Sequence, residues 1–187
     1  MEGGIKAWQG VVATGAYEVG LFLLDDIEDQ SDLIRIAWAL EDASRAFYVA
    51  ARERFPEEAF RTTIDALIGA EERHRERLAD AYVRLRPKRP LEPSAAQGRM
   101  EGIVTLDDAL AWLRAPERTL IEVLEASMQI EANSLDFYLK TIERAGDEDV
   151  KRVLRWVEKE ERAHLTRLAA LLDAAVRGAP GDEGPEG

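Results

Sequence analysis

Apolar residues recur at spacings of three and four along most of the chain, which is the pattern of amphipathic α-helices. Alanine, leucine, glutamate and arginine dominate these stretches, and all four favour helix. Prolines, glycines and capping residues divide the pattern into segments. We expect helices over residues 31–55, 56–85, 106–114, 116–145 and 148–177, a loop over 86–102, and a disordered tail over 178–187.

Several residues mark the expected helix ends. Ser31 or Asp32 is the expected N-cap of the first helix, and Pro56 and Pro116 are expected at the first positions of the second and third long helices. Gly146 and Asp147 form a stop followed by a new cap.

The expected helices form two long hairpins joined by a connection long enough to return along the bundle. The predicted fold is therefore all-α, a ferritin-like four-helix bundle with a long crossover connection. The bundle is expected to span residues 30–177, after an N-terminal leader over 1–29.

Composition excludes several classes of chemistry. The 187 residues include no cysteine, which excludes disulfides, cysteine-bound metal sites and thiol nucleophiles. A net charge of −12 argues against a nucleic-acid partner. No apolar run reaches 18 residues, and the Val11–Leu24 stretch lacks a signal-peptide cleavage site, so we expect no membrane partner and a cytoplasmic protein.

The two long hairpins are related by an internal repeat. Shifting the chain by 90 residues aligns 33–78 with 123–168 and leaves 11 of 46 positions identical. Both histidines of the chain, His74 and His164, fall on equivalent positions, and each follows a glutamate by three residues. The matched pairs that bear on chemistry are Glu41/Glu131, Ser44/Ser134, Phe47/Phe137, Tyr48/Tyr138, Glu71/Glu161 and His74/His164.

Spacing predicts that these acidic residues and histidines meet in the bundle core. Glu41 lies 15 residues before Pro56 and Glu71 lies 15 residues after it, so both sit at one height on antiparallel helices. Glu131 and Glu161 repeat this count around Gly146. One Glu from each of two helices and a Glu-x-x-His from each of the other two is the ligand set of di-iron and di-manganese bundles. Iron, manganese or zinc suits such donors.

A single Glu-x-x-His motif is also common on a solvated helix face. Here apolar residues share the stripe of each motif, and the motif occurs twice, which favours a metal site. Glu72 and Glu160 are nearby alternatives as ligands, but neither recurs at the 90-residue offset, so we interpret them as surface charges.

The repeated pattern, EDASRAFY with EERH and EANSLDFY with ERAH, resembles the rubrerythrin-like branch of the ferritin-like superfamily over 31–176. The resemblance implies a di-iron site bridged by Glu71 and Glu161. Glu41, Glu131, His74 and His164 would be the terminal ligands. Tyr48 and Tyr138 match family tyrosines that hydrogen-bond a ligand on another helix, and the alternative is that they are ordinary core tyrosines.

Two departures from the resembled family change the expected chemistry. Ser134 stands where rubrerythrins carry an additional glutamate used in redox-linked ligand exchange, and Ser44 is its repeat partner. The chain also lacks the cysteines of the family's electron-feeding rubredoxin module. Electrons must therefore come from elsewhere, or the chain does not turn over as a peroxide reductase.

The N-terminal segment carries a second, shorter resemblance. EGGIKAWQG is similar to the closing segment of a rhodanese domain, and a glycine-rich leader is the alternative interpretation. Residues 17–24 predict a strand or helical turn that packs on the bundle or on a second chain, which favours a homodimer.

These features predict an oxidoreductase with two iron ions that reduces peroxide or dioxygen. The alternatives are a ferroxidase-type protein that handles iron without a separate substrate, and a structural bundle with a vestigial site. Trp38 and Met128 precede the Glu41 and Glu131 positions by three residues, and core packing is their expected role over control of oxidant access. The basic stretch 84–90 is interpreted as a solvated loop, with docking of an acidic electron donor as the alternative.

Overall fold

The computed structural model describes residues 27, 29–91, 96–100 and 104–178. The described residues form five helices. Most of the predicted leader, including residues 17–24, and almost all of the predicted tail lie outside this part of the chain. The bounds are α2 (Gln30–Arg54), α3 (Glu58–Leu85), α4 (Leu106–Arg114), α5 (Leu120–Arg144) and α6 (Glu148–Gly178).

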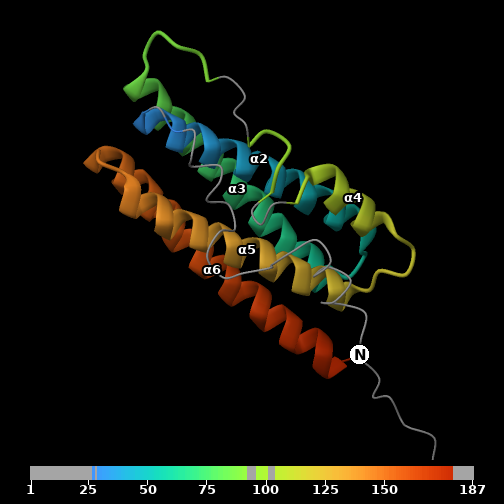
Figure 1. Cartoon of the computed structure of the whole chain (residues 1–187). Coiled ribbons are helices and arrows are strands. Elements are labelled where there is room, and N and C mark those ends of the chain that lie inside the picture. The colour runs from blue at the N-terminus through green and yellow to red at the C-terminus, as the bar shows by residue number, and fades with distance from the viewer. Residues whose placement is uncertain (1–26, 28, 92–95, 101–103, 179–187) are drawn as a thin grey trace, which may run out of the picture.

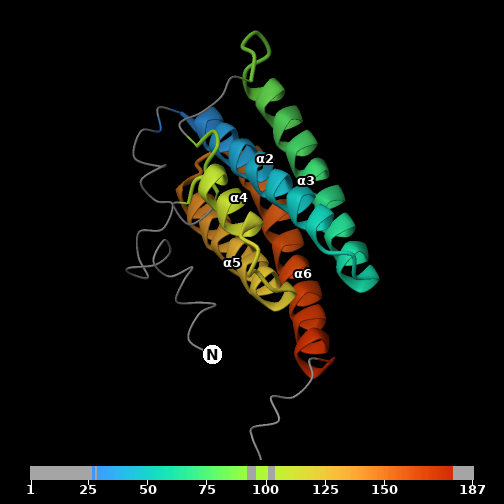
Figure 2. The same cartoon turned by 90° about the vertical axis from the view of Figure 1, so that its right-hand side faces the viewer.

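The four long helices make the predicted bundle of two hairpins. α2 packs against α3 and α5 against α6, and the hairpins meet mainly through α3 and α6. After α3 the chain returns along the bundle, with α4 lying beside α2, and reaches the opposite end before α5 begins (Figures 1 and 2). The all-α fold with a long crossover is confirmed, and no helix in the described ranges is long and apolar enough to cross a bilayer.

Helix ends differ from the prediction by a few residues, for local reasons. α2 is capped by Asp29 rather than by Ser31 or Asp32, because the Asp29 side chain accepts from the backbone of Ser31 in a capping box with Asp32. Pro56 and Pro116 lie in the turns before α3 and α5 instead of at the first helical positions. The predicted cap at Asp147 is confirmed, since its side chain accepts from the backbone of the α6 first turn.

Side chains tie the helix ends together at one end of the bundle. The Arg86 guanidinium after α3 pairs with Asp29 and donates to the Ser31 hydroxyl at 3.3 Å. The Gln30 side-chain oxygen accepts from the backbone N–H of Gly146 at 2.7 Å, in the turn between α5 and α6. The start of α2 therefore contacts both the end of its own hairpin and the turn of the other hairpin.

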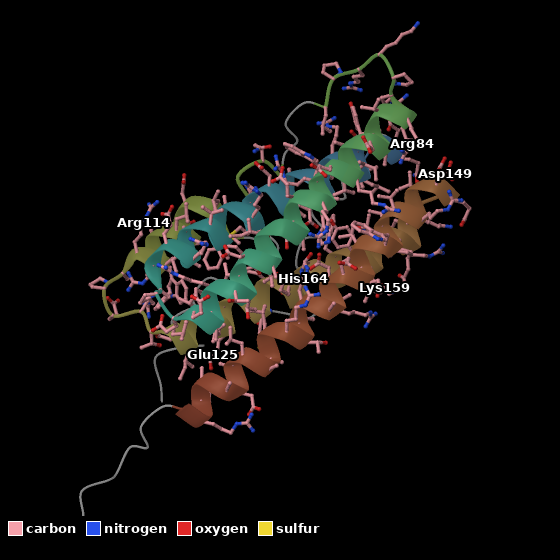
Figure 3. All side chains as sticks on the ribbon, turned by 180° about the vertical axis from the view of Figure 1, so that it is seen from behind. Arg84, Arg114, Glu125, Asp149, Lys159 and His164 are labelled. Carbon is pink, nitrogen blue, oxygen red and sulfur yellow. The ribbon has the colours of Figure 1, made fainter. Side chains whose placement is uncertain are left out.

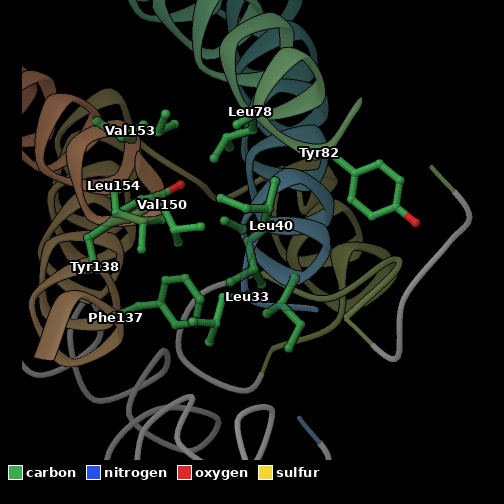
Figure 4. Packing of buried hydrophobic residues seen from close by; sticks show 14 of the residues in the cluster. Leu33, Leu40, Leu78, Tyr82, Phe137, Tyr138, Val150, Val153 and Leu154 are labelled. Atoms are coloured by element: carbon green, nitrogen blue, oxygen red, sulfur yellow. The ribbon is translucent and has the colours of Figure 1, made fainter. Parts of the chain in front are cut away.

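Two apolar clusters fill the bundle, one toward each end. The first combines early α2, late α3, late α5 and early α6, with side chains such as Leu40, Leu78 and Phe137 (Figure 4). The second combines late α2, early α3, early α5 and late α6. Along every long helix one buried glutamate falls between the two clusters: Glu41, Glu71, Glu131 and Glu161. A polar layer therefore divides an otherwise apolar core.

Candidate metal centre

The polar layer contains four glutamates and two histidines, one Glu from each of α2 and α5 and a Glu–His pair from each of α3 and α6. All six side chains are at most 2% exposed: Glu41, Glu71, His74, Glu131, Glu161 and His164. Figure 3 shows His164 in the interior of the bundle, between α6 and α3. These are the six residues that the spacing of the sequence places at one height.

Each histidine faces the glutamate of the other helix in its own hairpin. His74 Nδ1 lies 3.0 Å from Glu41 Oε2, and His164 Nδ1 lies 2.9 Å from Glu131 Oε2. The same Nδ1 of His74 lies 3.3 Å from Glu161 Oε1, across the hairpin boundary. The two imidazoles stack at 5.5 Å between ring centroids. The arrangement follows the internal repeat closely.

The donor atoms fall into two sets that share two members. Glu41, Glu71, His74 and Glu161 offer one set of ligand atoms within 4.8 Å of one another. Glu71, Glu131, Glu161 and His164 offer the second set. Glu71 and Glu161 belong to both, so they lie where carboxylates could bridge two metal ions.

Without a metal, the pKa values of the buried carboxyl groups shift in opposite directions. The pKa of Glu71 is raised well above 4.5 by burial and by the charge of Glu41, to which it hydrogen-bonds. Burial also raises the pKa of Glu41. The charge of His74 and hydrogen bonds from Glu71, His74 and Tyr138 outweigh this effect, and the net pKa of Glu41 falls to about 2. The pKa of Glu131 is lowered by the equivalent contacts with His164.

The cluster is chemically suited to cations. Glu71 Oε2 is buried and accepts no hydrogen bond. Leaving a buried carboxylate oxygen unpaired costs several kcal/mol, roughly, and a coordinated cation removes that cost. Four carboxylates and two divalent ions balance in charge, with neutral imidazoles completing the set. The residues present therefore fit a pair of divalent metal ions.

Two buried tyrosines join the hairpins through the polar layer. The Tyr48 hydroxyl on α2 donates to Glu131 on α5, and the Tyr138 hydroxyl on α5 donates to Glu41 on α2. Burial and the charge of Glu131 raise the pKa of Tyr48 well above 10, so this phenol stays protonated and remains a donor. The hydrogen bonds expected from the sequence are present, and each crosses between hairpins.

The remaining candidate residues lie outside the donor sets. Glu72 forms ion pairs with Arg45 at 2.6 Å and Arg75 at 3.1 Å, which fits a surface charge. Trp38 packs on the first apolar cluster under the Arg75 guanidinium, and Met128 packs on the second. Glu160 belongs to neither donor set.

Sequence reasoning missed one aromatic contact of the cluster. The Trp156 ring of α6 meets the His74 ring edge-on, with centroids 5.5 Å apart. The repeat partner of Trp156 is Ala66, so the contact has no counterpart at His164. The mismatch between Trp156 and Ala66 in the repeat was the sequence feature that could have indicated this contact.

Comparison with known families identifies the fold and the class of site. The family model described as Rubrerythrin matches residues 32–172. The chain belongs to the rubrerythrin family. A rubrerythrin is a ferritin-like protein of the di-iron class, which agrees with the paired donor sets around Glu71 and Glu161. The search of curated proteins yields no match.

Solved structures support the ferritin-like fold of this chain. A hypothetical protein from Pyrococcus furiosus is similar over 80% of this chain and 92% of its own, with 24% identity and a TM-score of 0.65. A two-domain protein from Anabaena variabilis, with DJ-1/ThiJ/PfpI-like and ferritin-like domains, aligns with 98% of this chain and 51% of its own, at 13% identity and a TM-score of 0.63. At these identities the likeness concerns the fold alone.

Proposed function

We propose that this chain is a di-iron oxidoreductase that reduces hydrogen peroxide or dioxygen with electrons from an external donor. The observation that carries the proposal is the buried, duplicated donor set in which two carboxylates belong to both halves. The family supports the di-iron class. These 187 residues contain no cysteine to bind an iron–sulfur group, so the proposal includes a donor outside them.

Six residues would hold the ions, and two tyrosines orient the carboxylates. Glu41 and His74 would hold one ion, Glu131 and His164 the other, and Glu71 and Glu161 would bridge them. Bound iron would supply the electron chemistry at the oxidant. The two tyrosine hydroxyls fix one oxygen of each terminal carboxylate, which leaves the other oxygen to face the histidine and the metal.

Metal uptake would displace protons from the cluster. Without metal, burial and the neighbouring carboxylates raise the pKa of Glu71, so its carboxyl keeps a proton to higher pH than an ordinary glutamate does. A bridging carboxylate must be ionised, and binding therefore releases that proton. Calorimetry in buffers of different ionisation enthalpy would measure the release, and Glu71→Gln should reduce it.

An anaerobic titration with ferrous iron, followed by peroxide or dioxygen, tests the proposed function. Two irons per chain, oxidised rapidly by one of the two oxidants with turnover when reductant is supplied, support it. Slow oxidation with mineral growth would instead support the ferroxidase-type protein that handles iron without a separate substrate. Failure to bind iron in a fixed ratio overturns both.

Glu71→Ala tests the bridging role, with Glu72→Ala as its neighbour control. Loss of a shared ligand should abolish binding of both irons, whereas Glu72 faces Arg45 and Arg75 and its removal should leave two irons bound. Iron per chain after gel filtration gives the answer. If Glu71→Ala retains one intact ion, Glu71 does not bridge.

A further inference from the structure

The polar layer follows the internal repeat, but the surface outside it does not. Trp156 packs edge-on against His74 and is half-buried, so one face of the ring points toward the molecular surface. The Arg77 guanidinium lies over that ring, 4.3 Å from its centroid. Trp156 therefore connects a residue of the donor set to an exposed arginine.

An open hollow of about 370 Å³ surrounds this tryptophan. Its walls are Arg73, Glu76, Arg77, Asp80, Arg84 and Trp156. We call these six residues the Trp156 face. Its three arginines outnumber its two acids, on a chain whose net charge is −12, and Lys88 and Arg89 follow Arg84 in the next loop. Figure 3 shows Arg84 near the end of α3, beside the start of α6.

The opposite face of the bundle provides an internal comparison. At the 90-residue offset, Arg73, Arg77 and Arg84 correspond to Ala163, Arg167 and Ala174, and Trp156 corresponds to Ala66. Glu76 and Asp80 correspond to Thr166 and Ala170, so the two sets of side chains carry the same net charge. The faces differ in Trp156 and in the neighbouring Lys88 and Arg89, whose counterparts are Gly178 and Ala179. Metal binding requires only the symmetric interior, so the asymmetry calls for a separate role.

We propose that the Trp156 face docks an acidic one-electron carrier protein, and that Trp156 and His74 form a packed route from that carrier to the metal centre. The inference rests on the proposed function, which requires an external donor. Positive side chains on an acidic protein select a partner of opposite charge and raise its rate of encounter. An aromatic ring in contact with a metal ligand shortens the gap that an electron must cross, because packed atoms couple better than solvent.

The electrons balance over two encounters. In each one the reduced carrier would lose one electron to the centre, where bound iron would pass from ferric to ferrous. Two such transfers, with two protons from solvent, return the electrons that convert one hydrogen peroxide to two waters. The Trp156 ring stays chemically unchanged in this scheme.

The first test measures docking without redox chemistry. Oxidised plant-type [2Fe–2S] ferredoxin, an acidic carrier, is titrated into zinc-loaded chain at low salt. The double variant Arg73→Gln/Arg77→Gln should weaken binding tenfold or more, and added salt should weaken wild-type binding. The matched control, Arg114→Gln/Arg167→Gln, removes the same charge from exposed positions elsewhere and should bind as wild type. Equal loss in both double variants would overturn the docking site.

The second test measures the route. Reduced ferredoxin is mixed with the diferric chain in a stopped-flow instrument, after two irons per chain have been verified. At saturating ferredoxin, Trp156→Ala should slow reduction tenfold or more, and the rate of Trp156→Phe should fall between those of Trp156→Ala and wild type. Reduction by dithionite, which needs no docking face, should be the same in all three. An unchanged ferredoxin rate in Trp156→Ala would overturn the route.

The failure of this inference is distinguishable from the failure of the proposed function. If dithionite-reduced chain consumes peroxide or dioxygen but the arginine and tryptophan variants behave as wild type, only the docking face is wrong. If dithionite-reduced chain consumes neither oxidant, the oxidoreductase proposal is itself wrong.

Discussion

Single hydroxyl groups hold the geometry of the polar layer. Tyr48 and Tyr138 each donate to a carboxylate of the opposite hairpin from a fully buried position. Their rings also pack in the two apolar clusters, so they act both as core residues and as partners of the donor set. The two interpretations of these tyrosines from sequence are therefore compatible.

Tyr48→Phe/Tyr138→Phe should lower metal affinity while the fold is retained. Phenylalanine preserves the ring packing but leaves Glu131 and Glu41 each without a donor. Loss of such a partner costs about 10- to 100-fold in metal affinity, which a competition titration with a chelator would measure. Tyr82→Phe is the control, since the Tyr82 hydroxyl bonds the Pro90 carbonyl at 3.2 Å, outside the donor sets. Equal affinities in both variants would contradict the positioning role.

Glu71→Gln should stabilise the metal-free chain increasingly as pH rises. The folded-state pKa of Glu71 lies above the unfolded value of 4.5. The contribution of Glu71 to the free energy of unfolding is therefore complete below pH 4.5 and is lost as pH rises through the folded-state pKa. The gap between variant and wild type should widen by up to about 1.4 kcal/mol per pH unit in that window. Urea unfolding between pH 4 and 8 measures it. Glu76→Gln, on the exposed face of α3, should show no such trend.

Capping residues decide where the helices begin. Thr119 and Glu122 form a reciprocal capping box at the start of α5, with the Thr119 hydroxyl accepting from Glu122 N–H at 3.2 Å and Glu122 accepting from Thr119 N–H at 2.8 Å. These bonds satisfy backbone donors that the first turn leaves unpaired. They explain why α5 starts after Thr119 and not at Pro116, since proline alone supplies no cap.

Thr119→Ala should destabilise the chain by about 1 kcal/mol through loss of this cap. Burial raises the pKa of Glu122, but hydrogen bonds from Thr119 and the Arg118 charge outweigh it and lower that pKa. The Glu122 contribution is therefore present above pH 4.5 and is lost as pH falls through the lowered value. Thr166→Ala, at an exposed position inside α6, should be neutral or slightly stabilising. The urea midpoints of Thr119→Ala and Thr166→Ala, each against wild type at pH 7 and pH 3, measure these effects. Equal destabilisation by the two substitutions at pH 7 would contradict the capping role of Thr119.

At the scale of the whole molecule, the metal centre acts as a cross-link among four helices. Each long helix contributes one glutamate to the layer that separates the two apolar clusters. Without metal, the hairpins are joined there by tyrosine–glutamate and histidine–glutamate contacts, while the neighbouring carboxylates repel one another. Metal binding replaces carboxylate repulsion with coordination to ions that all four helices share.

Chelation should lower the melting temperature of the whole bundle in one step. Ligands that bind only the folded state stabilise it by mass action, about 2.7 kcal/mol when free metal is 100 times its dissociation constant. For a chain of this size that corresponds to roughly 5 to 10 °C. Calorimetry of zinc-loaded and chelator-treated protein measures the shift. In Glu71→Ala the two conditions should coincide, and a persistent shift there would place the stabilising metal elsewhere.

The amino-acid pattern alone predicts the helices, the hairpin repeat and the residues of the polar layer. These depend on the helical period and on rise per residue, which are local properties, so equal counts from Pro56 and Gly146 place Glu41, Glu71, Glu131 and Glu161 at one height. The structure brings these four and both histidines together, while their role as ligands stays a prediction.

The contacts between hairpins are defined by the packing of the assembled bundle. Tyr48 reaches Glu131 and Tyr138 reaches Glu41, and Trp156 meets His74 across the α3–α6 contact. Such pairings depend on how two packed helices cross and how far each side chain extends, and neither quantity is a periodic property of one helix. The symmetric interior was therefore predictable from the repeat, whereas the asymmetric Trp156 face required the assembled bundle.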